Sequence, residues 1–359
     1  MAIQAPEQPP SLSLKSFTPR TPLAELNAFV ESIRPLLSRV IVLFNGKGGQ
    51  GKTSIASHLA GLLAELETAK AEEGKPAGRV LLGELDPQGN TLEDLGLRAH
   101  PDNDNGESLA IAVQYGQAPT IIRDAGGRPR LDVIPSGEEL SSLPALMVAM
   151  QQKSGKAAWL GLAVMLARLA NEYAWIILDV PPSTKENQQL ALTAARWVIT
   201  PVNTGDEAST RGLSGVAHRF VDVEDLNPDI ELLGTAMFDF EHRYYTDRKT
   251  KEKRPVGLWV EVRAELEELL ATAGSDAPVF KSVIRSAPRV AKAARKRGQL
   301  SYEVGEATDG ITRLQKLKGE KGEVLPTERA EDVGLDYEDL AGEIVSRIVA
   351  IEAEEDAAA

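Results

Sequence analysis

Residues 40–54 read Val-Ile-Val-Leu-Phe-Asn-Gly-Lys-Gly-Gly-Gln-Gly-Lys-Thr-Ser, and this stretch decides the fold. It fits G-x-x-x-x-G-K-[ST], the pattern of a phosphate-binding loop, with Gly46, Gly51, Lys52 and Thr53 at the fixed positions. The first five residues predict a buried parallel strand. Apolar residues at helical spacing follow the loop: Ile55, Ala56, Leu59, Leu62 and Leu63. Strand, loop and helix therefore come in the order that such a loop requires.

The composition of the loop suits a polyphosphate ligand. Glycines let backbone N–H groups approach the anion, and the following helix presents its positive end to it. Lys52 adds a mobile charge for the β and γ phosphates, and the hydroxyl of Thr53 can ligate Mg²⁺. A Gly-rich turn without a ligand is the alternative, and the flanking strand and helix argue against it. The predicted nucleotide-binding residues are Gly46, Lys47, Gly48, Gly49, Gln50, Gly51, Lys52, Thr53 and Ser54.

Lys47 lies inside the glycine run, either as a solvated lysine on a tight turn or as a second cation for the phosphates. The order K-G-G-x-G-K-T in residues 47–53 resembles the deviant Walker A signature of the ParA/MinD family of ATPases. In that family, the lysine that corresponds to Lys47 reaches the nucleotide of a partner subunit. The resemblance implies an ATP- and Mg²⁺-dependent homodimer in which Lys47 and Lys52 both serve catalysis.

The composition of the chain narrows the class of protein. Its 359 residues can hold one large α/β domain with extensions. The absence of cysteine excludes disulfides and zinc–thiolate sites, and it excludes the iron–sulfur branches of the same superfamily. No apolar run approaches the ~20 residues of a membrane span, and Met1–Arg20 lacks the core of a signal peptide, so we expect a cytoplasmic protein. A net charge of −13 argues against a uniformly basic nucleic-acid binder but permits a local basic patch.

Two further strand ends carry acidic residues. Residues 79–90 end in Asp86-Pro-Gln-Gly-Asn, which resembles the second motif of the ParA branch, where this aspartate serves hydrolysis by positioning water or Mg²⁺; taken alone, Asp86 caps a turn. Glu84 stands where the family often has aspartate, which leaves its role open. Residues 175–183, Trp-Ile-Ile-Leu-Asp-Val-Pro-Pro-Ser, form a Walker B pattern. In this pattern Asp179 holds Mg²⁺ through a coordinated water, and Thr53 and Asp179 are the predicted metal residues.

Apolar strands are also expected at residues 131–136, 197–202 and 232–238, alternating with helical stretches. This order predicts the α/β fold of a P-loop NTPase, with a mostly parallel, twisted sheet and helices on both faces. The predicted divisions are residues 1–20, a flexible tail; 21–38, a helix starting at Thr21-Pro22; 39–300, the ATPase domain; 301–335, a polar insertion or loop; and 336–359, a closing helix with an acidic tail.

Two segments, residues 243–254 and 281–297, concentrate positive charge. The second contains no acidic residue, and Pro288 and Gly298 bound a predicted helix with a basic face. A charge run is usually a solvated surface. The ParA family binds DNA without sequence preference through basic residues late in the chain, so the resemblance favours DNA. The predicted DNA-contacting residues are Arg285, Arg289, Lys292, Arg295, Lys296 and Arg297.

The closing helix is acidic, with Glu338, Asp339, Glu343 and Glu352. Membrane-targeting MinD proteins end in a basic amphipathic helix instead. Because anionic lipid repels an acidic helix, no membrane partner is expected.

The motifs together resemble those of a ParA-type ATPase with weak activity of its own. The resemblance implies an ATP-dependent homodimer that binds nucleoid DNA, is stimulated by a ParB-like centromere-binding protein, and segregates a plasmid or chromosome. Two alternatives stay open: an ATPase that positions a protein cargo, and an ATP-dependent filament on DNA. A metabolic ligase with a similar loop is the least favoured, because no signal for a small-molecule pocket is visible.

Overall fold

The computed structural model describes residues 12–204, 211–240, 244–246, 253–255, 258–307 and 327–358. Its centre is a seven-stranded sheet in the order β3-β2-β4-β1-β5-β6-β9, in which every pairing is parallel. The strands are β1 Val40–Leu43, β2 Arg79–Glu84, β3 Leu131–Ile134, β4 Tyr173–Asp179, β5 Trp197–Asn203, β6 Glu231–Phe240 and β9 Val279–Arg285. A separate antiparallel pair joins β7 Tyr244–Thr246 to β8 Lys253–Pro255. The parallel sheet confirms the predicted fold class.

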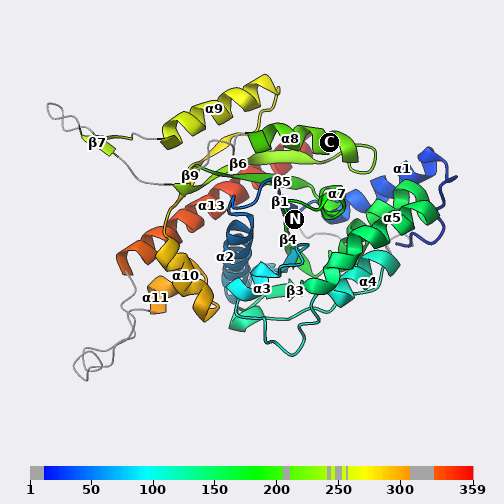
Figure 1. Ribbon diagram of the computed structural model, residues 1–359, viewed down its shortest axis with the longest axis horizontal. Coiled ribbons are helices and arrows are strands. Elements are labelled where there is room, and N and C mark those ends of the chain that lie inside the picture. Colours follow the sequence, from blue (N-terminus) through cyan, green and yellow to red (C-terminus); the bar gives the residue numbers. More distant parts are fainter. Residues whose placement is uncertain are drawn as a thin grey trace.

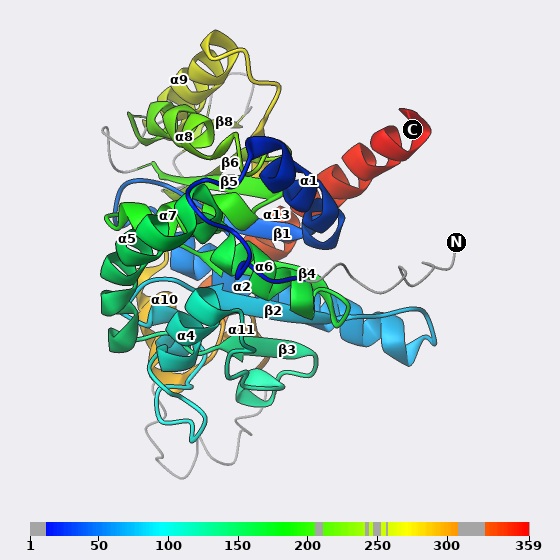
Figure 2. The same ribbon diagram turned by 90° about the vertical axis from the view of Figure 1, so that its right-hand side faces the viewer.

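Helices cover both faces of the sheet (Figure 1). One face carries α1 Leu23–Ile33, α4 Glu107–Tyr115, α5 Leu143–Ser154, α6 Gly161–Leu169, α7 Lys185–Ala194, α8 Arg211–Val223 and α9 Leu258–Thr272. The other carries α2 Lys52–Glu72, α3 Asn90–Asp94, α11 Ser301–Ala307 and α13 Thr327–Ala358, with α10 Pro288–Arg297 beside them. The turned view in Figure 2 shows the C-terminal end of α13 projecting past the sheet.

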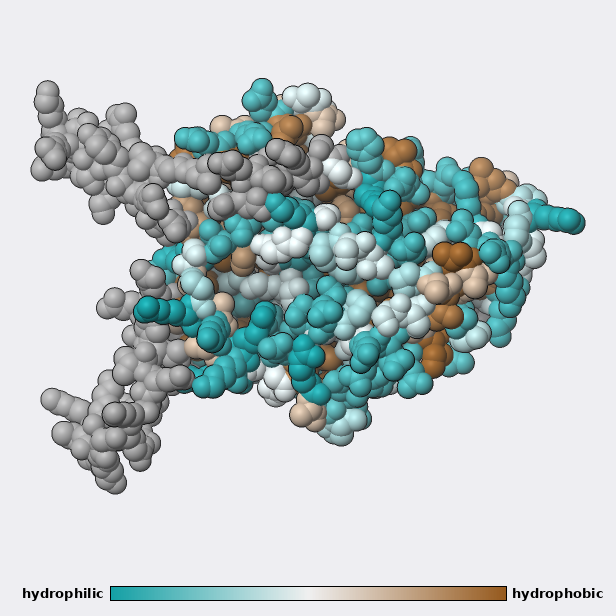
Figure 3. Space-filling view, viewed as in Figure 1, coloured by the Kyte–Doolittle hydropathy of each residue, from teal (hydrophilic) through white to brown (hydrophobic). Residues whose placement is uncertain are grey.

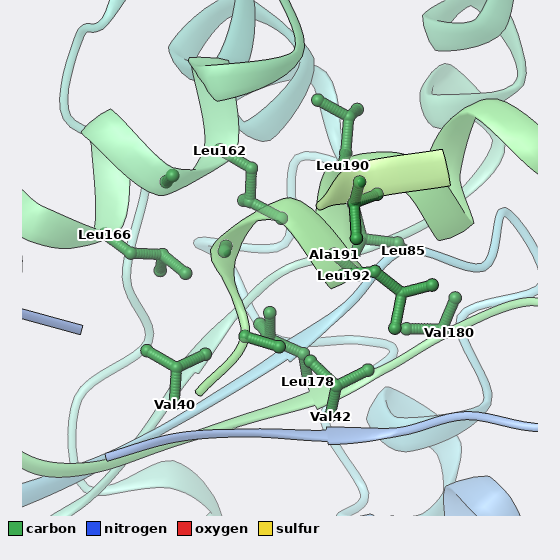
Figure 4. Packing of buried hydrophobic residues seen from close by; sticks show 14 of the residues in the cluster. Val40, Val42, Leu85, Leu162, Leu166, Leu178, Val180, Leu190, Ala191 and Leu192 are labelled. Carbon is green, nitrogen blue, oxygen red and sulfur yellow. The ribbon is translucent and has the colours of Figure 1, made fainter. Parts of the chain in front are cut away.

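Strand β1 shows why two layers of helices are needed. Its side chains alternate between the two faces, and all four are buried: Val40 and Val42 belong to one core, and Ile41 and Leu43 to the other. A strand buried on both faces has no polar side and reads as a continuous apolar run. Figure 4 shows Val40 and Val42 packed near leucines of α6 and α7.

The segment before the sheet is partly packed, which corrects the expectation of a flexible tail through residue 20. Leu12 and Phe17 are buried in the same core as α1, and the ring of Phe17 meets that of Phe29 edge-on, with 5.2 Å between centroids. Pro22, rather than the predicted Thr21, is the N-cap of α1, so the helix starts one residue later than predicted. A 3₁₀ turn, η1 Arg34–Leu37, continues it to the first strand.

Helices form at both ends of residues 301–335, the segment predicted to be a polar insertion or loop. Residues Ser301–Ala307 form α11, and α13 starts at Thr327 rather than at residue 336. A few apolar side chains are enough to fix these turns, because Val304 and Ala330 are buried together beside α10. Residues 308–326 of the predicted insertion lie outside the described part of the chain.

Helix α13 is joined to the loop helix α2 through one histidine. The imidazole of His58 stacks on Tyr337, with 3.7 Å between ring centroids and 12° between planes. Its Nε2 accepts the N–H of Ser301 at 2.9 Å, so Nδ1 carries the proton and donates to the carbonyl of Ser54 at 2.7 Å. The ring is therefore held neutral between three elements.

None of the described helices is long and apolar enough to cross a membrane. Hydrophilic residues cover most of the molecular face in Figure 3, which is viewed from the same side as Figure 1.

The buried His58 predicts a loss of stability in acid. Burial lowers the pKa of His58 from 6.5 to about 4, so between these values the unfolded chain binds the proton and the folded chain does not. The free energy of unfolding therefore falls as the pH is lowered from about 6.5 to about 4, by about 3 kcal/mol from this group. Urea titrations at pH 7 and pH 4 should show a smaller acid loss for His58→Gln.

His100→Gln is the matched control, because its ring lies partly exposed at the surface. It should keep the acid loss of the wild type. An equal acid loss in the wild type and in His58→Gln would refute the assignment.

Candidate functional site

The predicted motifs meet at the carboxyl edge of the sheet. Strand β1 lies between β4 and β5, and the register sets Leu43 beside Asp179 and Glu84 beside the same Asp179. The loop between β1 and α2 therefore opens where β2, β4 and β5 also end. Since ligands of open parallel sheets bind outside the carboxyl ends of the strands, this edge is the expected binding position.

The backbone of the loop requires glycine where it turns into α2. Gly51 is the N-cap of α2 and has φ 84°, in the left-handed region. A Cβ at Gly51 would lie 2.4 Å from the ring of Phe238, so any larger residue would meet the end of β6 as well. Gly46 has open space around its Cα instead. The loop is thus closed against β6 on one side and open on the other.

Two asparagines that the sequence analysis did not single out, Asn45 and Asn203, form hydrogen bonds to the backbone of the loop. Asn45 donates from Nδ2 to the carbonyl of Pro201 at 2.7 Å and accepts the N–H of Lys47 at 3.0 Å. Asn203 donates from Nδ2 to the carbonyl of Gly49 at 3.1 Å. Both asparagines sit at strand ends, which is a signal that a sequence search can use.

Gln50 was predicted to bind nucleotide, and its side chain points into the protein. Its Oε1 accepts the N–H of Asn203 at 2.8 Å, and its Nε2 donates to the carbonyl of Gly48 at 3.3 Å. The hydroxyl of Ser54 is likewise engaged, at 2.7 Å from that of Tyr337 on α13. For Gln50, the main-chain N–H is therefore the group that can face an anion.

Lys52 and Thr53 point to the ends of other elements. The Nζ of Lys52 donates to the carbonyl of Lys47 at 3.0 Å, and Lys52 is only 6% exposed. Burial lowers the pKa of Lys52, and the charges of Asp179 and Asp86 oppose that effect. The hydroxyl of Thr53 donates to Oδ2 of Asp179 at 2.5 Å, so the loop is tied directly to the end of β4.

The second carboxylate oxygen of Asp179 is unsatisfied. Its Oδ1 is buried and has no hydrogen-bond donor among the described residues. Burial raises the pKa of Asp179 well above its ordinary value, and the nearby charge of Glu84 adds to the effect. An unmet carboxylate oxygen beside a threonine hydroxyl is a suitable donor set for Mg²⁺ and its water shell. The residues present therefore fit the predicted metal.

Glu84 is a structural acid, which answers the role left open by the sequence. Its side chain is fully buried, and its two oxygens accept from Asn90 N, Thr91 N, Thr91 Oγ1 and Ser136 Oγ at 2.9, 2.9, 2.6 and 2.8 Å. Burial raises the pKa of Glu84, and these hydrogen bonds act in the opposite direction. Glu84 thus fixes the start of α3 and the end of β3 to the end of β2.

Asp86 caps a turn near the loop, and its role in hydrolysis stays a prediction. Its Oδ1 accepts the N–H of Gln88 at 3.0 Å, which is the turn cap expected of an isolated aspartate before proline. Its charge also acts on the pKa values of Lys52 and Asp179, so the carboxylate lies at the same site. The turn places this acid next to the loop.

The basic run after β9 forms the predicted helix but not one uniform surface. Helix α10 starts at Pro288 and ends at Gly298, which has φ 64°. Its exposed cations are Arg289, Lys292, Arg295, Lys296 and Arg297.

Two of the six predicted DNA contacts have carboxylate partners instead. Arg285 pairs with both oxygens of Asp336, at 2.6 and 2.8 Å, and also with Asp332. Nε of Arg295 pairs with Asp94 at 2.6 Å. The run has no acid of its own, but acids from α13 and α3 reach it. Both arginines are therefore engaged within the protein, and their contact with DNA stays a prediction.

Comparison with known proteins agrees with the motifs. Residues 38–232, more than half of the chain, match the family described as an AAA domain. The chain is 31% identical to the chromosome partitioning protein ParA of Myxococcus xanthus over 58% of its own length and 67% of that protein. It is 31% identical to ParA of Caulobacter vibrioides over 59% of its length and 73% of that protein.

Among solved structures, the fold resembles that of a McdA variant from Cyanothece in complex with ATP. The TM-score is 0.62 at 18% identity, and the match covers 86% of this chain and 96% of the other. At this identity the likeness supports the fold alone.

The metal donor set predicts how Mg²⁺ binding should respond to mutation. Thr53→Val and Asp179→Asn should each weaken Mg²⁺ binding to the nucleotide complex about 10- to 100-fold, because each removes a donor that holds the metal or its water. Thr53→Ser keeps the hydroxyl and should stay within about threefold of the wild type. Titration of Mg²⁺ against a fluorescent ATP analogue measures this. Equal Mg²⁺ affinity for Thr53→Val and Thr53→Ser would contradict it.

Proposed function

The chain belongs to the ParA/MinD family of P-loop ATPases, and on that premise we propose that it is a partition ATPase switched by nucleotide. In the proposed cycle, two subunits close on ATP and Mg²⁺, the dimer binds DNA without sequence preference, and hydrolysis releases it. The observation that carries the proposal is the second lysine of the loop. Lys47 is partly buried between the exposed Gly46 and Gly48, whereas Lys52 is buried. This difference supports a contact with a partner subunit for Lys47 and a contact with its own nucleotide for Lys52.

The position of each side chain supports its proposed role. Bound ATP supplies the phosphoanhydride bond that is cleaved. Lys52 gives up its hydrogen bond to the Lys47 carbonyl and turns its ammonium to the phosphates. Thr53 and Asp179 hold Mg²⁺. Asp86, fixed by its turn, orients water for hydrolysis.

The DNA-binding surface of the proposed dimer is α10. Four of its cations, Arg289, Lys292, Lys296 and Arg297, are exposed on a chain of net charge −13. Because a net negative charge repels phosphate, DNA is expected to approach where positive charge is concentrated. The proposed stimulator is a ParB-like protein bound to a centromere on a plasmid or chromosome, and the relatives named as chromosome partitioning proteins support a role in partition. The protein would then reside on the nucleoid.

Three variants test the switch. Lys47→Ala and Lys52→Ala should both abolish ATP-dependent DNA binding, because one removes the cross-subunit contact and the other removes the phosphate ligand. Asp86→Ala should retain DNA binding with ATP while its hydrolysis rate falls about 100-fold or more. Filter binding and phosphate release measure the two activities. Wild-type DNA binding by Lys47→Ala would exclude the cross-subunit role.

Salt dependence tests the surface. Two subunits with four exposed α10 cations each place about eight charges on DNA, so log affinity against log salt should have a slope of roughly −7. Fluorescence anisotropy with a labelled duplex measures this slope. The salt concentration is varied from about 50 to about 200 mM. Binding that does not change with salt would exclude this surface.

A further inference from the structure

Helix α3 lies between the Asp86 turn and the basic helix α10. It consists of residues Asn90–Asp94 and starts directly after the turn. Its first N–H groups are bound by the fully buried carboxylate of Glu84. The start of α3 is therefore fixed to the same strand end that presents Asp86.

The turn and α3 are also braced from outside. Arg98 donates from Nη2 to the carbonyl of Gln88 at 3.0 Å and pairs with Glu93 at 3.2 Å. One side chain thus holds both the turn and the helix. Together with the Glu84 hydrogen bonds, this makes the Asp86 turn and α3 a single unit.

The far end of α3 is bonded to α10. The last residue of α3, Asp94, accepts a charge-assisted hydrogen bond from Nε of Arg295 at 2.6 Å. The Asp94 side chain is 12% exposed and that of Arg295 is 47% exposed. A pair of this kind is directional and shielded on the Asp94 side, so it resists sliding of one helix along the other.

A second contact joins the same two elements through the backbone. Gly96, after α3, and Gly298, at the end of α10, face each other: a Cβ on Gly298 would lie 2.4 Å from the Cα of Gly96. Both residues have positive φ, 73° and 64°. Because no side chain lies between the two backbones, no flexible group can absorb a relative displacement.

We propose that α3 couples the nucleotide site to the basic helix, with Asp94 and Arg295 as positioning residues. A displacement of the Asp86 turn on nucleotide binding moves α3, and the Asp94–Arg295 pair and the Gly96–Gly298 contact carry it to α10. Arg295 then sets the orientation of the exposed cations rather than contacting phosphate. The inference rests on the proposed function for its ligand, DNA. By thermodynamic reciprocity, DNA on α10 changes nucleotide affinity by the same factor that nucleotide changes DNA affinity.

The test compares Asp94→Asn and Arg295→Gln with Arg297→Gln, which removes an equal charge from an exposed position on the same helix. DNA affinity is measured for the full-length protein with a non-hydrolysable ATP analogue and with ADP, at several salt concentrations. Arg297→Gln should make the salt slope shallower by about 2 for the dimer with the ATP analogue and by about 1 for a single subunit with ADP. Asp94→Asn and Arg295→Gln should lower the ratio of the two affinities at least about fivefold and leave the slope unchanged.

A charge exchange separates positioning from general damage. Asp94→Arg alone should lose the nucleotide dependence, and Asp94→Arg combined with Arg295→Asp should recover part of it. Thermal unfolding of all variants should agree, which excludes loss of fold as the cause. If Arg295→Gln instead makes the salt slope shallower, as Arg297→Gln does, Arg295 is a phosphate contact and the proposal is overturned.

Hydrogen exchange distinguishes failure of the coupling from failure of the proposed function. In the wild type without DNA, the ATP analogue should change the exchange of α10 amides, and Asp94→Asn and Arg295→Gln should remove that change. A wild-type protein that binds no DNA in either nucleotide state would end the partition proposal, while the α10 response would still support the coupling. An α10 that does not respond to nucleotide in the wild type would overturn the coupling.

Discussion

The site depends on the hydrogen bond from Thr53 to Asp179, which joins the phosphate-binding loop after β1 to the end of β4. A buried lysine and three acids, Glu84, Asp86 and Asp179, lie at this site. Burial disfavours both positive and negative charge: it lowers the pKa of Lys52 and raises the pKa values of Glu84 and Asp179. Of these, Glu84 is satisfied within the protein, whereas Asp179 keeps an oxygen without a donor in the described structure. A phosphate would compensate the buried charge of Lys52, and a cation would compensate that of Asp179. Nucleotide and metal are therefore expected to bind together.

The sequence was sufficient for what is encoded locally. The glycine spacing of the loop, the apolar runs and the acids at strand ends each occupy a few consecutive residues, and the rule that parallel strands end at one edge brings Lys52, Asp86 and Asp179 together. Helix α10 was likewise predicted from Pro288 and Gly298, because start and stop signals are local.

Contacts between residues far apart in the chain could not be predicted from the sequence. Arg295 and Asp94 are 201 positions apart, and nothing in a basic run indicates which remote carboxylate will reach it. Glu84 was ambiguous for the same reason, since its partner Ser136 comes from another strand end. The early start of α13 was missed because a few buried residues, such as Ala330 and Val333, stabilise a helix in a stretch whose composition is polar.

Because Arg285 and Arg295 are paired with carboxylates, the proposed DNA surface of one subunit has four other exposed cations, and the proposed dimer doubles that number. Four exposed cations on one subunit release few counterions, which corresponds to a salt slope of only about −4 and weak binding at physiological salt. Two subunits on one duplex double that number, and each phosphate contact multiplies the affinity rather than adding to it. On an acidic chain, the proposed closure of two subunits on ATP would therefore strengthen DNA binding by bringing two weak surfaces onto the same DNA, and the proposed movement of α10 would add to that effect.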